Sequence, residues 1–219
     1  VGGIISGKSN PGPAGSTLMG DQTIKKAIKN AREDKDIDAI VLRVDSGGGS
    51  GLASDMMWRE VYKTTVEDTS NIKPFIVSMS DAAASGGYYI ACQADKIVAD
   101  ETTVTGSIGV YYVRINFSEL LNRVGVYTDN IKKGERGDFG SASHLLTDEE
   151  RNEAFENIMS MYNTFKQRVI DGRENLNDIG ELDDIALGRV WTGLKAKEHG
   201  LVDEIGGLHD AIEIARKEA

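Results

Sequence analysis

Two apolar segments of the chain each end in a cluster of very small residues that leads into a helical pattern. The first segment, Asp38–Val44, is followed by the glycine run DSGGGSG and by the helical pattern LASDMMWREVYKTT. The second begins at Pro74 with PFIVSMS and is followed by DAAASGG and by YYIACQA. A buried strand, a glycine turn and a helix in succession are typical of βαβ units in a parallel α/β sheet. Ligands of such sheets bind beyond the carboxyl ends of the strands, so we expect both turns to face one site.

The remaining segments predict shorter elements. The predicted strands are 1–6, a segment around Ile97, 108–113 and 127–132, with a bend at 105–107 and loops over 7–17 and 133–146. The predicted helices are one that follows Asp21 as its N-cap, 117–124, one that runs from a capping box at Thr147 and Glu150 to about Gly172, and 209–217. The apolar and aromatic stripe of the long helix is interpreted as core or subunit contact.

Ser85 stands among alanines and glycines that have almost no side chain, so backbone and ligand can approach closely there. It would lie at the N-terminal end of the following helix, where unpaired N–H groups and the helix dipole favour negative charge. The hydroxyl therefore suits an attacking oxygen. Serine is also a preferred N-cap residue, so the residues alone leave both interpretations open.

The glycine run Asp45–Ser50 also has two chemical interpretations. It resembles a phosphate-binding loop, but it lacks the lysine of GxxxxGK[ST] and the spacing of GxGxxG, so nucleotide binding is not expected. Its backbone N–H groups can instead donate to a developing oxyanion, with Gly86 supplying a second donor. Acyl-transfer chemistry needs such a pair of donors.

Composition limits the classes of partner. The formal net charge of −10 argues against a nucleic-acid or anionic-membrane surface, because phosphate binding depends on clustered Lys and Arg. Cys92 is the only cysteine and has apolar neighbours, which predicts a buried thiol rather than a nucleophile. The three histidines, His144, His199 and His209, stand where solvated or capping side chains are expected. No apolar run is long enough to span a bilayer, and the abrupt start at Val1 suggests a segment upstream.

Four segments, in the same order, resemble the signal peptide peptidase A family, serine proteases of class S49. They are RVDSGGGSGLASDMMWRE, SMSDAAASGGYYIACQADKIVAD, TVTGSIGV and GRVWTGLKAKEHGLVDEIGG. The resemblance covers nearly the whole chain. It implies an α/β fold of the crotonase and Clp-protease type, with repeated ββα units, glycine-rich turns and a C-terminal helical portion, in a single domain over residues 1–219.

The resemblance implies a Ser/Lys dyad without a cofactor or a metal. Ser85 matches the nucleophile, and Ser107 matches the serine that hydrogen-bonds the general-base lysine. Gly48 and Gly86 fall where the family supplies oxyanion N–H groups. A lysine acts as a base near neutral pH only if burial lowers its pKa from about 10.4 by roughly three units, so the site is expected to be dry. The chain lacks a GxSxG segment, which argues against an α/β-hydrolase triad.

Two departures from the family pattern affect this site. The family's Ser-Pro-Gly-Gly turn is Ser46–Gly49 here, so Gly47 replaces the proline and a more flexible turn is expected. The lysine position of single-domain members falls on Gly137, and neither Lys132 nor Lys133 is a clear match. In two-domain members the lysine comes from the amino-terminal half. We therefore interpret this chain as the serine-bearing carboxy-terminal half of a longer protein, nearly inactive when taken alone.

The resemblance also implies partners and a location. The expected substrates are signal peptides and other extended apolar segments, and the expected assembly is a homo-oligomer with no nucleic acid. A membrane anchor is expected outside this chain, and the domain itself is expected to be soluble. The resemblance does not indicate on which side of the membrane the domain lies. Two alternatives remain: a crotonase-type enzyme that acts on acyl-CoA with the same oxyanion donors and an acidic or histidine base, and a non-catalytic scaffold half of the protease.

Overall fold

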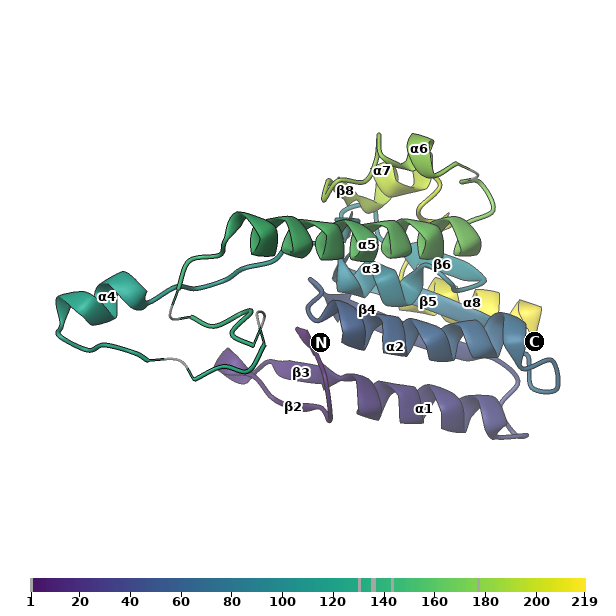
Figure 1. The fold of residues 1–219 in the computed structure, drawn as a ribbon. Coiled ribbons are helices and arrows are strands. Elements are labelled where there is room, and N and C mark those ends of the chain that lie inside the picture. The colour runs from purple at the N-terminus through teal and green to yellow at the C-terminus, as the bar shows by residue number, and fades with distance from the viewer. Residues whose placement is uncertain (1, 130, 135–136, 143, 177) are drawn as a thin grey trace. The chain divides into compact units, whose positions relative to one another are not determined.

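The computed structural model describes residues 2–129, 131–134, 137–142, 144–176 and 178–219 (Figure 1). They divide into two compact units, Val1–Gly109 with Tyr162–Ala219 and Val110–Met161. The two units are described separately below. The division does not test the prediction of one domain over residues 1–219, which stays a prediction.

The first unit is built around a six-stranded sheet whose central strand is β5 (Phe75–Ala84). The other strands are β4 (Ile40–Ser46), β6 (Lys96–Ala99), β7 (Val104–Gly106), β8 (Val190–Thr192) and β9 (Glu204–Ile205). Strand β4 runs parallel to β5 along one edge, and β6 and β7 run parallel to successive stretches of the other edge. Strand β9 continues the sheet parallel to β6, whereas β8 is antiparallel to β7. A mixed α/β architecture is therefore confirmed.

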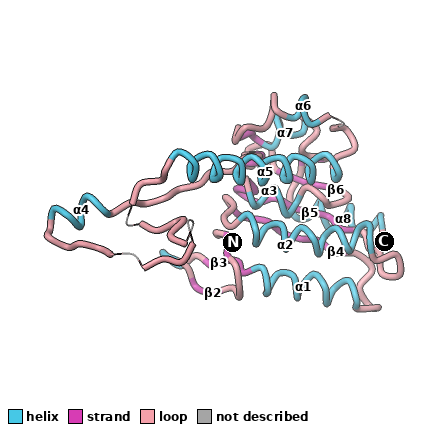
Figure 2. The backbone as a smooth tube through the Cα atoms, viewed as in Figure 1, coloured by secondary structure: helices cyan, strands magenta, loops and turns pink. Residues whose placement is uncertain are grey.

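Helices cover both faces of this sheet (Figures 1 and 2). The helices and helical turns of the first unit are α1 (Asp21–Glu33), α2 (Gly51–Tyr62) with the π-helical turn η2 (Lys63–Glu67), α3 (Gly86–Ala91), the last turns of α5 (Asp148–Gly172), α6 (Ile179–Leu182), α7 (Gly193–Glu198) and α8 (Leu208–Glu218). Figure 1 shows α2 and α3 on one face and α8 on the other. Ile76 and Val98 form a buried cluster with Ala211 and Ala215 of α8. Burial on both faces explains the apolar runs Phe75–Val77 of β5 and Ile97–Ala99 of β6.

Helix α5 begins with the predicted capping box. The N–H of Thr147 donates to the Glu150 carboxylate at 2.9 Å, and the N–H of Glu150 donates to the Thr147 hydroxyl at 3.2 Å. Phe165 is buried and its ring lies 4.5 Å from that of Tyr89. The C-terminal half of the apolar stripe is therefore core, as expected. Met161, by contrast, is 46% exposed.

The N-terminal segment folds more than the sequence predicted. It forms β1 (Ile4–Ile5), β2 (Asn10–Pro11), the 3₁₀ turn η1 (Pro13–Gly15) and β3 (Thr17–Gly20), in a sheet of order β1-β3-β2. The prediction of a simple loop over 7–17 is therefore wrong.

The expected N-cap of α1 is also wrong, because the helix starts at Asp21 and Gly20 takes the N-cap position. The Asp21 carboxylate instead accepts the N–H of Gly7 at 2.8 Å. This bond fixes the preceding turn against the first turn of the helix.

The second unit contains α4 (Ser118–Arg123) and the first turns of α5. The strands predicted over 108–113 and 127–132 are absent from the described part of these segments. Ile108 is buried, but the apolar side chains that follow it in these segments are mostly exposed, with Tyr111 84% exposed and Tyr127 80% exposed. An apolar stretch forms a stable strand only beside a partner strand, and the described residues supply none here. Across the described part of the chain, every helix falls short of the length or the apolarity needed to cross a bilayer.

Tyr88 offers a test of the packing behind α3. Its side chain is fully buried and its hydroxyl donates to the Leu201 carbonyl at 2.9 Å. We expect Tyr88→Phe to lower the free energy of unfolding by about 1–2 kcal/mol, because the buried carbonyl loses its donor. Urea denaturation measures the change. The matched control is Tyr62→Phe on the partly exposed end of α2, for which we expect a change within about 0.5 kcal/mol; equal losses in both variants would contradict this account.

Candidate active site

Ser85 lies at the junction between the carboxyl end of β5 and the start of α3. Its backbone has φ 51° and ψ −119°, a left-handed conformation that is rare for a residue other than glycine. The junction is held by two bonds: the N–H of Ser85 donates to the Gly106 carbonyl, and its carbonyl accepts the N–H of Tyr89, both at 2.9 Å. Such backbone strain costs about 1–3 kcal/mol and clusters at functional sites.

The hydroxyl of Ser85 does not cap the helix. Ser85 occupies the N-cap position of α3, yet its side chain makes no capping hydrogen bond there. The interpretation of this hydroxyl as an ordinary N-cap is therefore wrong. Its half-buried side chain stands instead at the helix N-terminus without a structural bond to the helix.

Ser107 occupies the equivalent position on the neighbouring strand. Ala84 pairs with Gly106 in the parallel register of β5 and β7, so Ser85 and Ser107 are the next residues along adjacent strands. Adjacent strands lie about 4.8 Å apart, so the two serines are neighbours. Ser107 also has a positive φ, 50°, and its N–H donates to the Arg189 carbonyl at 2.7 Å. The structure therefore brings together the two serines that the sequence singled out.

The glycine turn after β4 lies against the Ser85 junction, as expected. A Cβ added to Gly48 would lie 2.9 Å from the Ser85 Cβ and 2.7 Å from the Gly86 nitrogen. A Cβ added to Gly87 would lie 2.5 Å from the Ser46 carbonyl oxygen. These distances are shorter than real Cβ contacts, so the two turns can touch only because glycine occupies both.

The amide expected from Gly48 is not available in this conformation. The Gly48 N–H donates to the Ser46 hydroxyl at 3.0 Å. The next amide, that of Gly49, donates to no acceptor among the described residues. Its nitrogen lies 3.2 Å from the position that a Cβ on Gly86 would take. The amide of Gly86 belongs to the first turn of α3, whose N–H groups have no partner within the helix. Gly49 and Gly86 thus carry amides at the Ser85 junction that have no acceptor among the described residues.

The sequence could not distinguish these glycines. Gly47, Gly48 and Gly49 are identical neighbours. Contacts from elsewhere in the chain decide which of their amides is bonded within the turn. The N–H of Ile4 donates to the Gly48 carbonyl, and the Ile4 carbonyl accepts the N–H of Ser50, both at 2.9 Å. Strand β1 therefore sets the direction of the turn, and no signal in the turn itself reveals it.

The two lysines considered as general bases, Lys132 and Lys133, both lie in the second unit, as does Gly137. Lys132 Nζ forms an ion pair with the Asp138 carboxylate at 2.9 Å. Neither this pair nor the position of Lys133 identifies a base for Ser85. The origin of the general base therefore stays a prediction.

A possible metal-ligand cluster also lies in the second unit. Asp138, His144 and Glu150 bring ligand atoms within 4.8 Å of one another. Both imidazole nitrogens, however, face carbonyl oxygens, Nδ1 that of Leu145 at 2.7 Å and Nε2 that of Asp138 at 3.2 Å. These two acceptors favour the doubly protonated ring and raise the pKa of His144. A protonated ring cannot bind a metal, so the geometry fits an imidazolium ion pair better than a metal centre.

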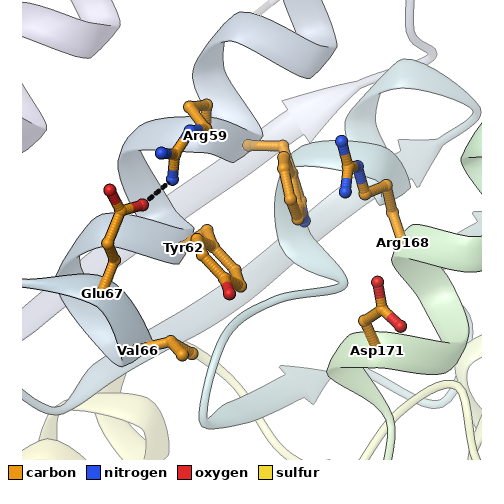
Figure 3. Close-up of a pocket in the computed structure, with 7 residues that line it drawn as sticks. Arg59, Tyr62, Val66, Glu67, Arg168 and Asp171 are labelled. Carbon is orange, nitrogen blue, oxygen red and sulfur yellow. Dashed lines mark hydrogen bonds and ion pairs between the residues drawn. The ribbon is translucent and has the colours of Figure 1, made fainter.

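A separate groove of about 480 Å³ lies at the far end of α2 from the glycine turn (Figure 3). The Arg168 guanidinium stacks over the Trp58 ring, 3.8 Å from its centroid, and Arg59 pairs with Glu67. With Asp171, the lining carries two positive and two negative side chains. Trp58, the lining residue of α2 nearest the glycine turn, lies seven residues after Gly51, which is about 10 Å along a helix that rises about 1.5 Å per residue. The lining contains no residue of either glycine turn. The groove is not part of the candidate active site.

Comparisons with known proteins follow the same segments. The sequence model of a family described as peptidase family S49 matches residues 67–219. The chain is 40% identical over 221 residues to the chloroplastic serine protease SPPA of Arabidopsis thaliana, covering all of this chain and 32% of that protein. It is 37% identical to Protease 4 of Haemophilus influenzae and 35% identical to the putative signal peptide peptidase SppA of Enterococcus faecium, covering 33% and 62% of those proteins. The chain thus spans about a third of the first two relatives.

Gly49 tests the close approach of the turn to β1. A Cβ at Gly49 would lie 2.2 Å from the Ile4 carbonyl oxygen, whereas a Cβ at Gly47 would meet nothing within 4 Å. We expect Gly49→Ala to lower the free energy of unfolding by about 2–3 kcal/mol, because the backbone must shift. Gly47→Ala is the matched control, with an expected change within about 0.5 kcal/mol. Chemical denaturation compares them, and a Gly49→Ala variant as stable as the control would disprove the contact.

Cys92 tests whether a second nucleophile exists. The thiol is fully buried, and burial raises its pKa to about 12. Since the thiolate is the reactive form, we expect no reaction of the folded chain with a disulfide reagent at pH 8 and stoichiometric reaction in denaturant. Release of the chromophoric thiol measures both. Rapid reaction of the folded chain would show that the buried-thiol interpretation is wrong.

Proposed function

Because the chain belongs to peptidase family S49, we propose that it carries the nucleophilic half of a serine protease site, with Ser85 as the nucleophile. The observation that supports this most directly is the conformation of Ser85, which has a positive φ and makes no helix-capping bond. The amides of Gly49 and Gly86 lie at the same junction and have no acceptor among the described residues. A merely structural serine would be expected to bond its own helix. The proposal covers one S49 domain over residues 1–219, as the carboxy-terminal half of a longer protein.

The chemistry follows from these positions. A base takes the Ser85 hydroxyl proton while the oxygen attacks the peptide carbonyl carbon, and the carbonyl π electrons move onto its oxygen. The N–H groups of Gly49 and Gly86 donate to this oxyanion, and each such donor contributes about 3 kcal/mol to transition-state stabilisation. Collapse expels the amine, which takes the proton from the base. Water then hydrolyses the acyl ester by the same steps, and Ser85 is restored.

The general base in this proposal is a lysine supplied from outside the chain, by an upstream domain or a neighbouring subunit. Ser107 is proposed to accept a hydrogen bond from, or donate one to, that lysine, which its position beside Ser85 supports. The lysine must be desolvated when it docks, because only a lowered pKa allows a neutral amine near pH 7. The isolated chain is therefore proposed to be nearly inactive.

The substrate, the fold family and the assembly are finer parts of the same proposal. The name of the Enterococcus relative supports signal peptides, and by extension other extended apolar segments, as substrates. The two successive strand, glycine-turn and helix units support the crotonase and Clp-protease type of fold. A homo-oligomer and a membrane anchor in a segment outside this chain complete the proposal.

A fluorophosphonate probe, which labels activated serines, tests the proposal. We expect labelling of Ser85, mapped by peptide mass, in the longer protein that supplies the lysine and little labelling in this chain alone. Ser85→Ala should reduce peptide hydrolysis by the longer protein at least about 10³-fold. Ser80→Ala, in the strand that leads to Ser85, is the matched control and should stay near wild type, because the bond its hydroxyl accepts comes from the Arg43 guanidinium.

The alternatives give different outcomes in the same experiment. Retained hydrolysis in the Ser85→Ala variant would exclude Ser85 as the nucleophile. Retention of the chain on immobilised coenzyme A, without labelling, would favour the crotonase-type enzyme. Absence of labelling and of hydrolysis in both forms would favour a scaffold. Efficient labelling of the isolated chain would instead require a base within this chain, and would overturn the proposed origin of the lysine.

A further inference from the structure

We propose that Ser46 is a positioning residue for the oxyanion site: its hydroxyl holds the Gly48 amide inward and thereby helps to direct the next amide, that of Gly49, toward Ser85. This inference rests on the proposed function, because it assigns a role to the turn that only oxyanion chemistry needs. Ser46 itself contacts no reacting atom in this arrangement.

The Ser46 hydroxyl donates one hydrogen bond and accepts another. Ser46 is 2% exposed, and its Oγ donates to the Gly2 carbonyl at 2.7 Å. A hydroxyl has a single hydrogen, so the contact with the Gly48 N–H at 3.0 Å must be an acceptance. The donor direction is thus fixed by the Gly2 carbonyl, two residues before β1, and the acceptor lone pair is aimed at the turn. Buried polar groups with such defined partners have one orientation.

The planar geometry of the peptide between Gly48 and Gly49 determines where the Gly49 N–H points. A peptide group is planar and trans, so its N–H points opposite to its C=O. The Gly48 carbonyl accepts the N–H of Ile4, which lies on the β1 side of the turn. The Gly49 N–H therefore points away from β1, and its nitrogen lies on the side of Gly86. Ser46 fixes the peptide before this one, so the two successive peptide planes are both held.

This anchoring matters more here than in a turn that contains proline. Residues 47–49 are all glycine, the residue with the greatest backbone freedom, and a Cβ at Gly47 would touch nothing. Without the Ser46 hydroxyl, little restrains the peptide between Gly47 and Gly48. Catalytic donors must be held close to their productive geometry, and a displacement of about 1 Å can cost about 100-fold in rate. The serine supplies a restraint that the glycine at position 47 does not.

The test combines kinetics with amide exchange. In the longer protein, Ser46→Ala is expected to lower kcat about 10- to 100-fold with KM within about twofold, because the loss falls on transition-state donation. In the chain alone, NMR hydrogen exchange of the Gly48 amide should accelerate at least about tenfold. Ser46→Thr keeps the hydroxyl and should restore slow Gly48 exchange and most of kcat.

Ser54→Ala is the matched control. Ser54 is also a fully buried serine beside Gly86, but its hydroxyl donates to the carbonyl of Ser50, the N-cap residue of α2. It should leave Gly48 exchange and kcat near wild type. If Ser46→Ala does not fold, Ser46→Cys replaces it, since the thiol has a similar volume and is only a weak acceptor.

Two results would overturn the positioning role. One is a Gly48 amide that stays protected in Ser46→Ala. The other is a freed Gly48 amide with unchanged kcat in a protein whose Ser85→Ala variant is inactive, which would leave the proposed function intact. If a Ser85→Ala variant still hydrolyses peptides, the proposed function is wrong, and the role of Ser46 that depends on it is wrong as well.

Discussion

The contact between two glycine-containing turns is the constraint on which the rest of this structure depends. One turn follows β4 and the other joins β5 to α3, and side chains at Gly48 or Gly87 would collide with the opposing backbone. Because glycine stands at these positions, backbone nitrogens of both turns, those of Gly49 and Gly86, lie at the contact next to Ser85. The neighbouring strands are arranged around this contact, since Ser107 reaches Ser85 only through the register of β7 on β5.

The strained residues and the sheet register support one another. Ser85 and Ser107 leave parallel neighbouring strands with nearly the same positive φ, and each backbone is held by a carbonyl of another segment. Unfavourable dihedral angles persist only where surrounding contacts determine them. The surroundings here include β5, whose first residues Phe75–Val77 are fully buried, and a tyrosine, Tyr88, bonded to Leu201. Rigidity at this junction is thus a property of the whole first unit.

The sequence predicted what depends on local pattern and missed what depends on distant partners. The βαβ units, Ser85 at a strand–helix junction and the long capped helix follow from periodicity and small residues. The strands expected at 108–113 and 127–132 failed because no strand lies beside them among the described residues. The bonding of the Gly48 amide was out of reach, since it depends on the Ser46 hydroxyl and on the contacts of the turn with Ile4. Asp21 was misjudged because its partner, Gly7, lies in a loop that pattern alone cannot place.

The bond from the Ser107 N–H to the Arg189 carbonyl has a consequence for biosynthesis. Translation delivers Ser85 and the glycine turns to the ribosomal exit tunnel long before residue 189 has been made. Contacts between residues far apart in sequence form late, because the intervening loop must close first. The serine pair therefore cannot reach its final geometry on a nascent chain that stops before residue 189, and the arrangement matures only after that residue has been made.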